Sequence, residues 1–391
     1  MRRIFALPPL DGPIEVRGLA RRPAATDAAA ALRAALAARF DTRHVALFAS
    51  GREALRVAMR VFAERSGRDE AVIPAYTCWS VAAAAVAAGL RVRLVDVDAR
   101  GRIELGALRR LPLERVACVV VSNLFGVAEP VAPIAALAHA GGAAVIDDAA
   151  QSPGAEACDG MAGSRGDVAM LSFGRGKPIQ ALGGGALVWR DDALGFPEPA
   201  PPPGRPRLAR LRAHAWNLAL SSPGFTALAA VPAFGVGRTA FDPGFRRGAI
   251  GGDALVLAAL ALEDFDARAL RRTAHAQQMA ADLTERTRFE PLRAPAAFRA
   301  SYPRLAVLAP DAVSRDRALA ALARSGASSL YPAALTAVAA LAPHRSDSRG
   351  CPGADALASR LLTLPLHGRL AGSRWEASVR VLAGLTEARS G

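Results

Sequence analysis

Short apolar runs alternate with helical patterns along the first part of the chain, and this alternation constrains the fold more than any other feature. Strands that are apolar along their whole length are buried on both faces, which is typical of a parallel sheet covered by helices. Such a sheet gathers its ligands at the carboxyl ends of the strands. We therefore expect an α/β fold with a large, mostly parallel sheet. The predicted strands are His44–Ala49, Ala71–Pro74, Arg91–Val97, Val116–Ser122, Ala143–Ile146, Val168–Phe173 and Ala186–Trp189.

The length of the chain predicts a second domain. Its 391 residues, of which 52% are hydrophobic, can bury more than one core of typical size. We expect a large domain over residues 1–265 and a smaller C-terminal α/β domain over residues 266–391, connected by a long helix from Asp253 to about Ala281. Strands of the smaller domain are expected at Arg304–Leu308, Ser328–Tyr331 and Leu361–Leu364.

Lys177 is the only lysine in the sequence, and the other 48 of the 49 basic residues are arginine. Arginine supplies charge and hydrogen bonds equally well on a surface, but its guanidinium keeps its proton and cannot act as an amine nucleophile. A lysine amine can form a Schiff base with a carbonyl, and pyridoxal phosphate is the commonest cofactor that uses this reaction. The composition therefore predicts a chemical role for Lys177.

The surroundings of Lys177 also favour a ligand site. The residue lies between two predicted strands on a glycine-rich connection, with Gly174 and Gly176 before it and three glycines at 183–185 after it. Backbone without side chains can approach a ligand closely. A Walker A phosphate loop is excluded, because Pro178 stands where that motif needs a serine or threonine hydroxyl.

Two other strand ends carry candidate binding groups. Ser50, Gly51 and Arg52 follow the first strand and begin a helix, where free backbone amides and the helix dipole favour a phosphate. Asp147 and Asp148 follow the fifth strand and offer an acid for a pyridine nitrogen. The residues alone do not distinguish between these two aspartates.

Five motifs follow one another along the chain: Ser50-Gly51, Ile146-Asp147-Asp148-Ala149-Ala150-Gln151, Gly163-Ser164-Arg165-Gly166-Asp167, Ser172-Phe173 with Lys177, and Leu364-Pro365-Leu366-His367. Together they resemble the DegT/StrS family of pyridoxal-phosphate-dependent sugar aminotransferases, which have the fold-type-I architecture. The resemblance covers nearly the whole chain, and the order and spacing of the motifs carry it.

The resemblance implies which residues surround the cofactor ring. Lys177 would hold pyridoxal 5'-phosphate as a Schiff base, Asp148 would face its ring nitrogen, and Gln151 would lie near its hydroxyl. A cysteine at position 78 replaces the family's stacking aromatic. Either Trp79 or Tyr76 is therefore expected to supply the aromatic ring, or the stack is lost.

The resemblance also implies how the cofactor phosphate is held. The position of Gly51 binds the phosphate in the family, and Arg52 replaces the threonine that commonly follows it. Ser172 matches the family serine that bonds the phosphate. Arg247 lies near the position of a family asparagine that reaches the phosphate of the partner subunit, which implies a homodimer with shared sites.

The implied reaction is the transfer of an amino group, most often from glutamate, to a nucleotide-linked keto sugar in amino-sugar, polysaccharide or glycoconjugate biosynthesis. One alternative is a related pyridoxal-phosphate enzyme with another outcome, such as dehydration. Dehydratases of this family commonly have histidine at the lysine position, so Lys177 argues against that alternative. A second alternative is a regulatory or binding protein on the same fold.

Composition limits the possible partners and the compartment. The net charge is +14, but the arginines form no dense run and few aromatic residues accompany them, so we expect no nucleic-acid partner. A basic surface favours anionic substrates such as nucleotide sugars. The four cysteines are far apart and fit neither a zinc site nor a disulfide framework, and the N-terminus lacks the apolar core of a signal peptide. We therefore expect a cytoplasmic protein.

An irregular insert is expected at about residues 192–250. Its apolar stretch, residues 213–237, approaches the length of a membrane span, but Pro223 and Pro232 interrupt any single helix. We favour short helices that pack on the protein or line a dimer interface over a membrane anchor, and we expect no transmembrane segment.

Overall fold

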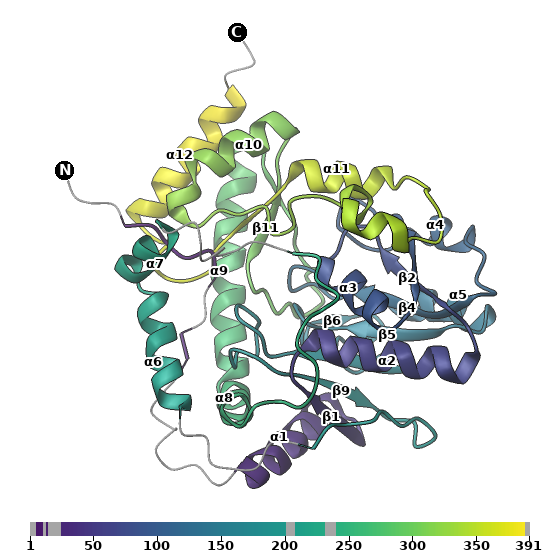
Figure 1. Ribbon diagram of the computed structural model, residues 1–391. Helices are drawn as coiled ribbons and strands as arrows, with labels where there is room; N and C mark the ends of the chain where they lie inside the picture. The colour runs from purple at the N-terminus through teal and green to yellow at the C-terminus, as the bar shows by residue number, and fades with distance from the viewer. Residues whose placement is uncertain (1–4, 11–12, 15–24, 201–207, 231–239, 388–391) are drawn as a thin grey trace.

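The computed structural model describes residues 5–10, 13–14, 25–200, 208–230 and 240–387 (Figure 1). A seven-stranded sheet with the order β1-β9-β8-β5-β4-β2-β3 forms its centre, and β9 is the one strand in this sheet that runs against its neighbours. The expected α/β fold with a mostly parallel sheet is confirmed. The strands are β1 (His44–Phe48), β2 (Glu70–Pro74), β3 (Arg91–Val95), β4 (Val116–Ser122), β5 (Ala144–Asp148), β8 (Val168–Ser172) and β9 (Gly185–Trp189).

Helices cover both faces of this sheet because successive residues of each strand point to opposite sides. Along β4, Cys118 and Val120 pack in the core that contains α2 and α3, whereas Val119 and Val121 pack in the core that contains α4 and α5. A third core joins β8 and β9 to α1 and α8. The helices are α1 (Ala25–Phe40), α2 (Gly51–Ser66), α3 (Trp79–Ala87), α4 (Leu105–Arg109), α5 (Ala132–Ala140) and α8 (Gly252–Glu263).

A second, three-stranded antiparallel sheet with the order β10-β11-β12 belongs to the C-terminal part, where it packs with α9, α10 and α12 around its own core. The split of the chain into domains at residues 265 and 266 stays a proposal; α9 begins there. The elements are β10 (Glu290–Pro291), β11 (Leu305–Leu308), β12 (Leu361–Leu364), α9 (Phe265–Arg286), α10 (Ala312–Ala321), α11 (Pro352–Arg360) and α12 (Ser373–Glu387), with a small hairpin of β6 (Glu156–Ala157) and β7 (Gly160–Met161).

Two expected elements differ from the structure. The single helix expected from Asp253 to about Ala281 is two helices, because Asp264 ends α8 and begins α9; Figure 1 shows α8 end-on beneath the upright α9. The strand expected at Ser328–Tyr331 is reduced to one bridge between Ser328 and Thr363. Leu330 has a φ of +61°, which a continuing strand cannot adopt, and the turn brings Tyr331 to the cavity described below.

Within the insert, the structure has two short helices, α6 (Ala209–Ala219) and α7 (Ser222–Ala229). This agrees with the expectation of short helices for the described part, whereas residues 231–237 of the apolar stretch lie outside the described residues. No helix in the described ranges has the length and apolar character that crossing a membrane requires.

Candidate active site

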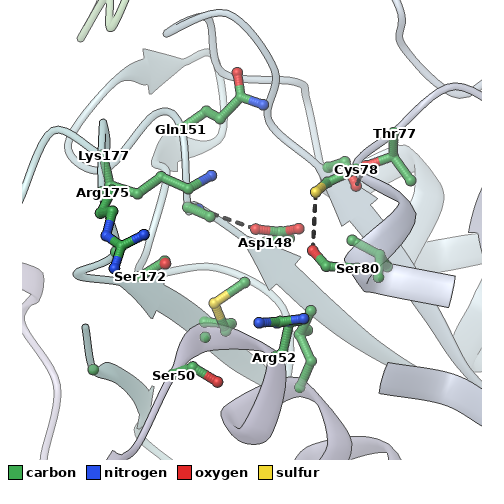
Figure 2. Close-up of a pocket in the computed structure, with 18 of the residues that line it drawn as sticks. Ser50, Arg52, Thr77, Cys78, Ser80, Asp148, Gln151, Ser172, Arg175 and Lys177 are labelled. Carbon is green, nitrogen blue, oxygen red and sulfur yellow. Dashed lines mark hydrogen bonds between the residues drawn. The ribbon is translucent and has the colours of Figure 1, made fainter. Parts of the chain in front are cut away.

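A cavity of about 510 Å³ lies where several strands of the large sheet end (Figure 2). Ser122, Asp148 and Ser172 are the last residues of β4, β5 and β8, three neighbouring parallel strands, and all three line the cavity. Because parallel strands place their carboxyl ends at one edge of the sheet, the topology itself brings these side chains together. The cavity volume lies within the range of small-molecule sites.

Lys177 enters this cavity from the connection between β8 and β9. Its backbone N–H donates to the carbonyl of Gly174 at 3.2 Å, and Gly176 adopts a φ of +73°, so the turn depends on glycine. In Figure 2 the amine of Lys177 extends toward the side of the cavity where Asp148 lies. Lys177 and Asp148 therefore line the same cavity.

The N-terminus of α2 forms another wall of the cavity. Ser50 caps this helix, since its Oγ accepts a hydrogen bond from the Glu53 N–H at 3.2 Å, and Gly51 and Arg52 occupy the first turn, where backbone amides have no acceptor within the helix. A Cβ on Gly51 would lie 2.9 Å from Cβ of Ser172. A side chain there would fill the space between the helix and β8, so the glycine keeps an anion cradle open.

Three arginines line the cavity, and only Arg52 was expected there from the sequence. Arg52 lies with its guanidinium 5.1 Å from the centre of the Phe245 ring, and Arg175 and Arg246 also line the cavity. Arg247 is exposed and is not among the lining residues. Its expected contact with a partner subunit's phosphate therefore stays a prediction.

Asp147 and Asp148 are adjacent in the sequence but have different partners. Asp147 is fully buried, and its carboxylate accepts hydrogen bonds from Nδ2 of Asn123 at 2.6 Å and from the N–H of Gly163 at 2.8 Å. The guanidinium of Arg165 lies 3.3 Å from the same carboxylate. Asp147 is thus occupied in holding the strand ends together, and Asp148 is the aspartate that lines the cavity.

The environment of Asp148 favours its protonated form. Burial raises the pKa of Asp148 to about 6, against the opposing effects of a hydrogen bond from the Ala150 N–H and of the Lys177 charge. The neighbouring Asp147 carboxylate raises the pKa further. An acid with this pKa can share a proton with a basic ring nitrogen, which is the role that the motif implies.

Gln151 joins the large sheet to the C-terminal part at the cavity wall. Its Nε2 donates to the Tyr331 hydroxyl at 2.5 Å, and its Oε1 accepts from the N–H of Phe125 at 3.1 Å. Burial raises the pKa of Tyr331 well above its usual value, so the phenol stays neutral. Gln151 is therefore fixed at both ends of its amide.

Neither of the two expected aromatic residues, Trp79 and Tyr76, lines the cavity. Trp79 lies outside the cavity lining, and its indole N–H donates to the carbonyl of Ala333 at 3.1 Å. Tyr76 is 1% exposed and packs edge-on against Tyr331. Among the described residues the cavity lining has one aromatic ring, that of Tyr331, and Cys78 lines the cavity where the family has its aromatic.

The donor set fits pyridoxal phosphate. The cavity offers one amine at Lys177, one protonatable carboxyl at Asp148, and a helix N-terminus beside Ser172 and Arg52 for a phosphate. The described residues contain no group of three or more His, Cys, Asp or Glu side chains that could hold a metal ion. The site therefore combines an amine, an acid and a place for an anion.

Because the two aspartates have different environments, replacing each of them by asparagine should have opposite effects on the stability of the protein. The folded-state pKa of Asp148 is about 6 and its ordinary value is 3.8, so wild-type stability falls as pH rises through this window. In cofactor-free protein, Asp148→Asn removes this fall in stability with rising pH, because asparagine does not ionise. Its unfolding free energy relative to wild type should therefore rise by about 2 kcal/mol between pH 4 and pH 7.

The matched control for this prediction is Asp147→Asn. It weakens the contacts with Arg165 and Asn123, and should lower the unfolding free energy by roughly 3 kcal/mol at pH 7. Denaturant unfolding at several pH values measures both variants. Equal losses of stability in Asp148→Asn and Asp147→Asn at pH 7 would contradict the assignment of separate roles.

Comparison with known proteins finds relatives of part of the chain. Residues 25–195 match the model of the DegT/DnrJ/EryC1/StrS aminotransferase family. A UDP-N-acetyl-3-dehydro-alpha-D-glucosamine 3-aminotransferase of Acidithiobacillus ferrooxidans is 32% identical over 164 residues, which is 42% of this chain and 44% of that protein. A pleiotropic regulatory protein of Geobacillus stearothermophilus is 30% identical over 165 residues, again 42% and 44%. The aligned part of the chain thus spans less than half the length of these relatives.

The fold match is longer than the sequence match. The PLP form of Spr1654 from Streptococcus pneumoniae superposes with a TM-score of 0.72 over 98% of both chains, at 15% identity. Residues 25–195 thus resemble the DegT/DnrJ/EryC1/StrS aminotransferase family in sequence, and almost the whole chain shares the fold of the Spr1654 structure.

Proposed function

We propose that the protein is a pyridoxal-phosphate-dependent aminotransferase that acts on a nucleotide-linked keto sugar. The observation that carries this proposal is the position of Lys177, the only lysine of the chain, in a cavity that also holds Asp148 and the N-terminus of α2. The family match and the sugar substrates in the names of relatives support it. Glutamate is the proposed amino donor, and amino-sugar, polysaccharide or glycoconjugate biosynthesis is the proposed context.

The cavity residues divide the work of holding the cofactor. The Gly51 and Arg52 amides, with the Ser172 hydroxyl, would bind the phosphate, and Asp148 would hold a proton at the ring nitrogen. Gln151, fixed by Tyr331, would orient the ring hydroxyl. Bound pyridoxal phosphate supplies an electron sink that stabilises negative charge at the carbon from which a proton is removed.

Lys177 would act first as the point of attachment and then as a base. Its Nζ would bond to the cofactor aldehyde at rest, and an incoming amino donor would free it. The free amine lies in the cavity and can take a proton from one carbon and return it to another. Arginine cannot take either role, because its guanidinium does not lose its proton.

Two alternatives keep a specific observation in their favour. A different pyridoxal-phosphate reaction is favoured by Cys78, which replaces the expected aromatic at the cavity wall. A regulatory protein is favoured by the name of the Geobacillus relative. Binding of the cofactor followed by turnover separates the aminotransferase from both. A cytoplasmic location is proposed as well, because all four cysteines are unpaired.

The first prediction concerns the cofactor. Purified protein incubated with pyridoxal phosphate and then reduced with borohydride should carry a stable adduct on Lys177, because reduction fixes the bond between the amine and the aldehyde. Peptide mass analysis locates the adduct. Lys177→Arg keeps the charge and should keep the fold, but it should carry no adduct and transfer no amino group. An unmodified Lys177 after incubation with excess cofactor would refute the enzyme proposal.

The second prediction concerns the oligomer. We propose a homodimer in which Arg247 completes the partner's site, since this exposed residue lies next to Arg246 of its own cavity. Chains with Lys177→Ala and chains with Arg247→Ala should each be inactive alone. After mixing and exchange of subunits, activity should recover to about a quarter of the wild-type value, because one in two dimers is mixed and has one intact site.

Absence of recovery would show that Arg247 acts within its own chain or has no role. Sedimentation of the wild-type protein provides the control. A monomer at the concentration of the assay would remove the basis of the shared site.

The third prediction concerns the amino acceptor. Enzyme loaded with the aminated cofactor should return to its lysine-bound form with nucleoside-diphosphate keto sugars, and only poorly with pyruvate or oxaloacetate. The arginines of the cavity wall attract the diphosphate, and this attraction is screened beyond roughly 8 Å at physiological salt, so apparent affinity should fall as salt rises. Absorbance of the cofactor follows the reaction. Rapid return with simple keto acids alone would refute the sugar proposal.

A further inference from the structure

A second cavity, of about 570 Å³, lies between α9 and the chain that leads into β11. It is distinct from the Lys177 cavity, with which it shares no lining residue. Thr273 and Gln277 of α9 form one wall, residues 293–302 form another, and Arg100, from the connection between β3 and α4, closes the cavity. The site is therefore assembled from three segments that are far apart in the sequence.

Positive charge dominates this second cavity. Arg100, Arg293 and Arg299 line it, and none of its lining residues is acidic. Arg299 is partly neutralised, since its guanidinium lies 3.1 Å from the Glu156 carboxylate. Arg293 donates to the hydroxyl of Thr284 at 2.8 Å. The backbone N–H of Arg100 donates to the Asp98 carboxylate at 2.8 Å, but among the described residues neither the Arg100 nor the Arg293 guanidinium forms an ion pair with a carboxylate. Two guanidinium groups thus remain available for an anion.

The rest of the lining is apolar and aromatic. The ring of Phe298 is partly exposed at the cavity, and Tyr302 is 4% exposed with its hydroxyl accepting a hydrogen bond from the Ala294 N–H at 2.9 Å. Burial raises the pKa of Tyr302, so its hydroxyl keeps a proton that it can donate. An anion that also carries a flat, polarisable ring matches this combination of guanidinium groups and aromatic faces.

The gap between the two cavities is too small for a sugar to pass. Arg100, Arg293, Ser122 and Leu124 line a space of about 20 Å³ between them, which holds about one water molecule. Glu129 also lines this gap, and burial raises its pKa to about 8, so it is mostly neutral at pH 7 and offsets little of the arginine charge. A ligand in the second cavity therefore does not reach Lys177 through this gap.

We propose that the second cavity binds a nucleoside diphosphate as a ligand separate from the amino acceptor. Arg100 and Arg293 bind the phosphates, and Phe298 packs against the base. The site does not depend on the proposed function, because the two cavities share no lining residue.

Binding of two probes, uridine diphosphate and inorganic pyrophosphate, tests the site by calorimetry. The titrations are made without cofactor and repeated after incubation with pyridoxal phosphate, and the affinities should agree because the two cavities share no lining residue. Arg100→Gln and Arg293→Gln should each weaken the binding of both probes about tenfold, which is the effect of losing one charge-assisted hydrogen bond. Arg110→Gln is the matched control: Arg110 is 71% exposed outside the cavity, and its removal should change affinity less than twofold.

The proposed contact with the nucleobase is tested by Phe298→Ala. This change should weaken the binding of uridine diphosphate about tenfold and leave the binding of pyrophosphate unchanged, because only the nucleotide has a base to stack. Equal effects on the two probes, or no effect on either, would refute the nucleoside part of the proposal.

The location of the bound nucleotide is tested by Arg246→Gln, which changes the Lys177 cavity and leaves the second cavity intact. If Arg246→Gln lowers the affinity for uridine diphosphate and Arg100→Gln does not, the nucleotide binds in the first cavity and the proposal is overturned. Equal losses in Arg100→Gln and in the Arg110→Gln control would show only general attraction to the basic surface and overturn it as well. Neither outcome depends on whether Lys177 carries a cofactor.

Discussion

The buried carboxylate of Asp147 is the interaction on which the candidate active site depends. It accepts from Asn123 at the end of β4, from Gly163 and from Arg165, and it thereby ties β4, β5 and the connection that enters β8 into one unit. Arg165 extends the unit, because it also donates to the carbonyl of Glu129 at 2.6 Å. A buried carboxylate is tolerated only with such compensation. Once Asp147 is satisfied in this way, its neighbour Asp148 is left to face the cavity.

This arrangement explains why the sequence predicts some parts of the site and not others. The strands of the large sheet, the helix N-terminus at Gly51 and the lysine turn follow from hydrophobic patterns and glycines, and the structure confirms these strands and the helix within a few residues. The choice between Asp147 and Asp148 does not follow from those patterns, since it depends on partners that are 16 to 24 residues away. Only the resemblance to a family identified Asp148 in advance.

The cavity lining differs from the expectation where distant parts of the chain meet. Trp79 was expected at the cavity because it lies near a strand end, but its indole has a partner in the carbonyl of Ala333, which is 254 residues away. Tyr331 takes the position at the wall because Leu330 turns the backbone with a φ of +61° and Gln151 donates to the hydroxyl of Tyr331. No local pattern around either residue indicates such contacts. A leucine in this backbone region is a strained choice that the surrounding packing has to maintain.

The use of arginine and lysine differs between the two cavities for a chemical reason. A group that binds phosphate needs a permanent charge and a planar fork of donors, which arginine provides, and both cavities are lined by arginines. A group that must bond to an aldehyde and then carry protons needs an amine that can lose its proton. A chain with 48 arginines and one lysine can therefore separate these two tasks, and its one lysine lines the same cavity as Asp148 and the N-terminus of α2.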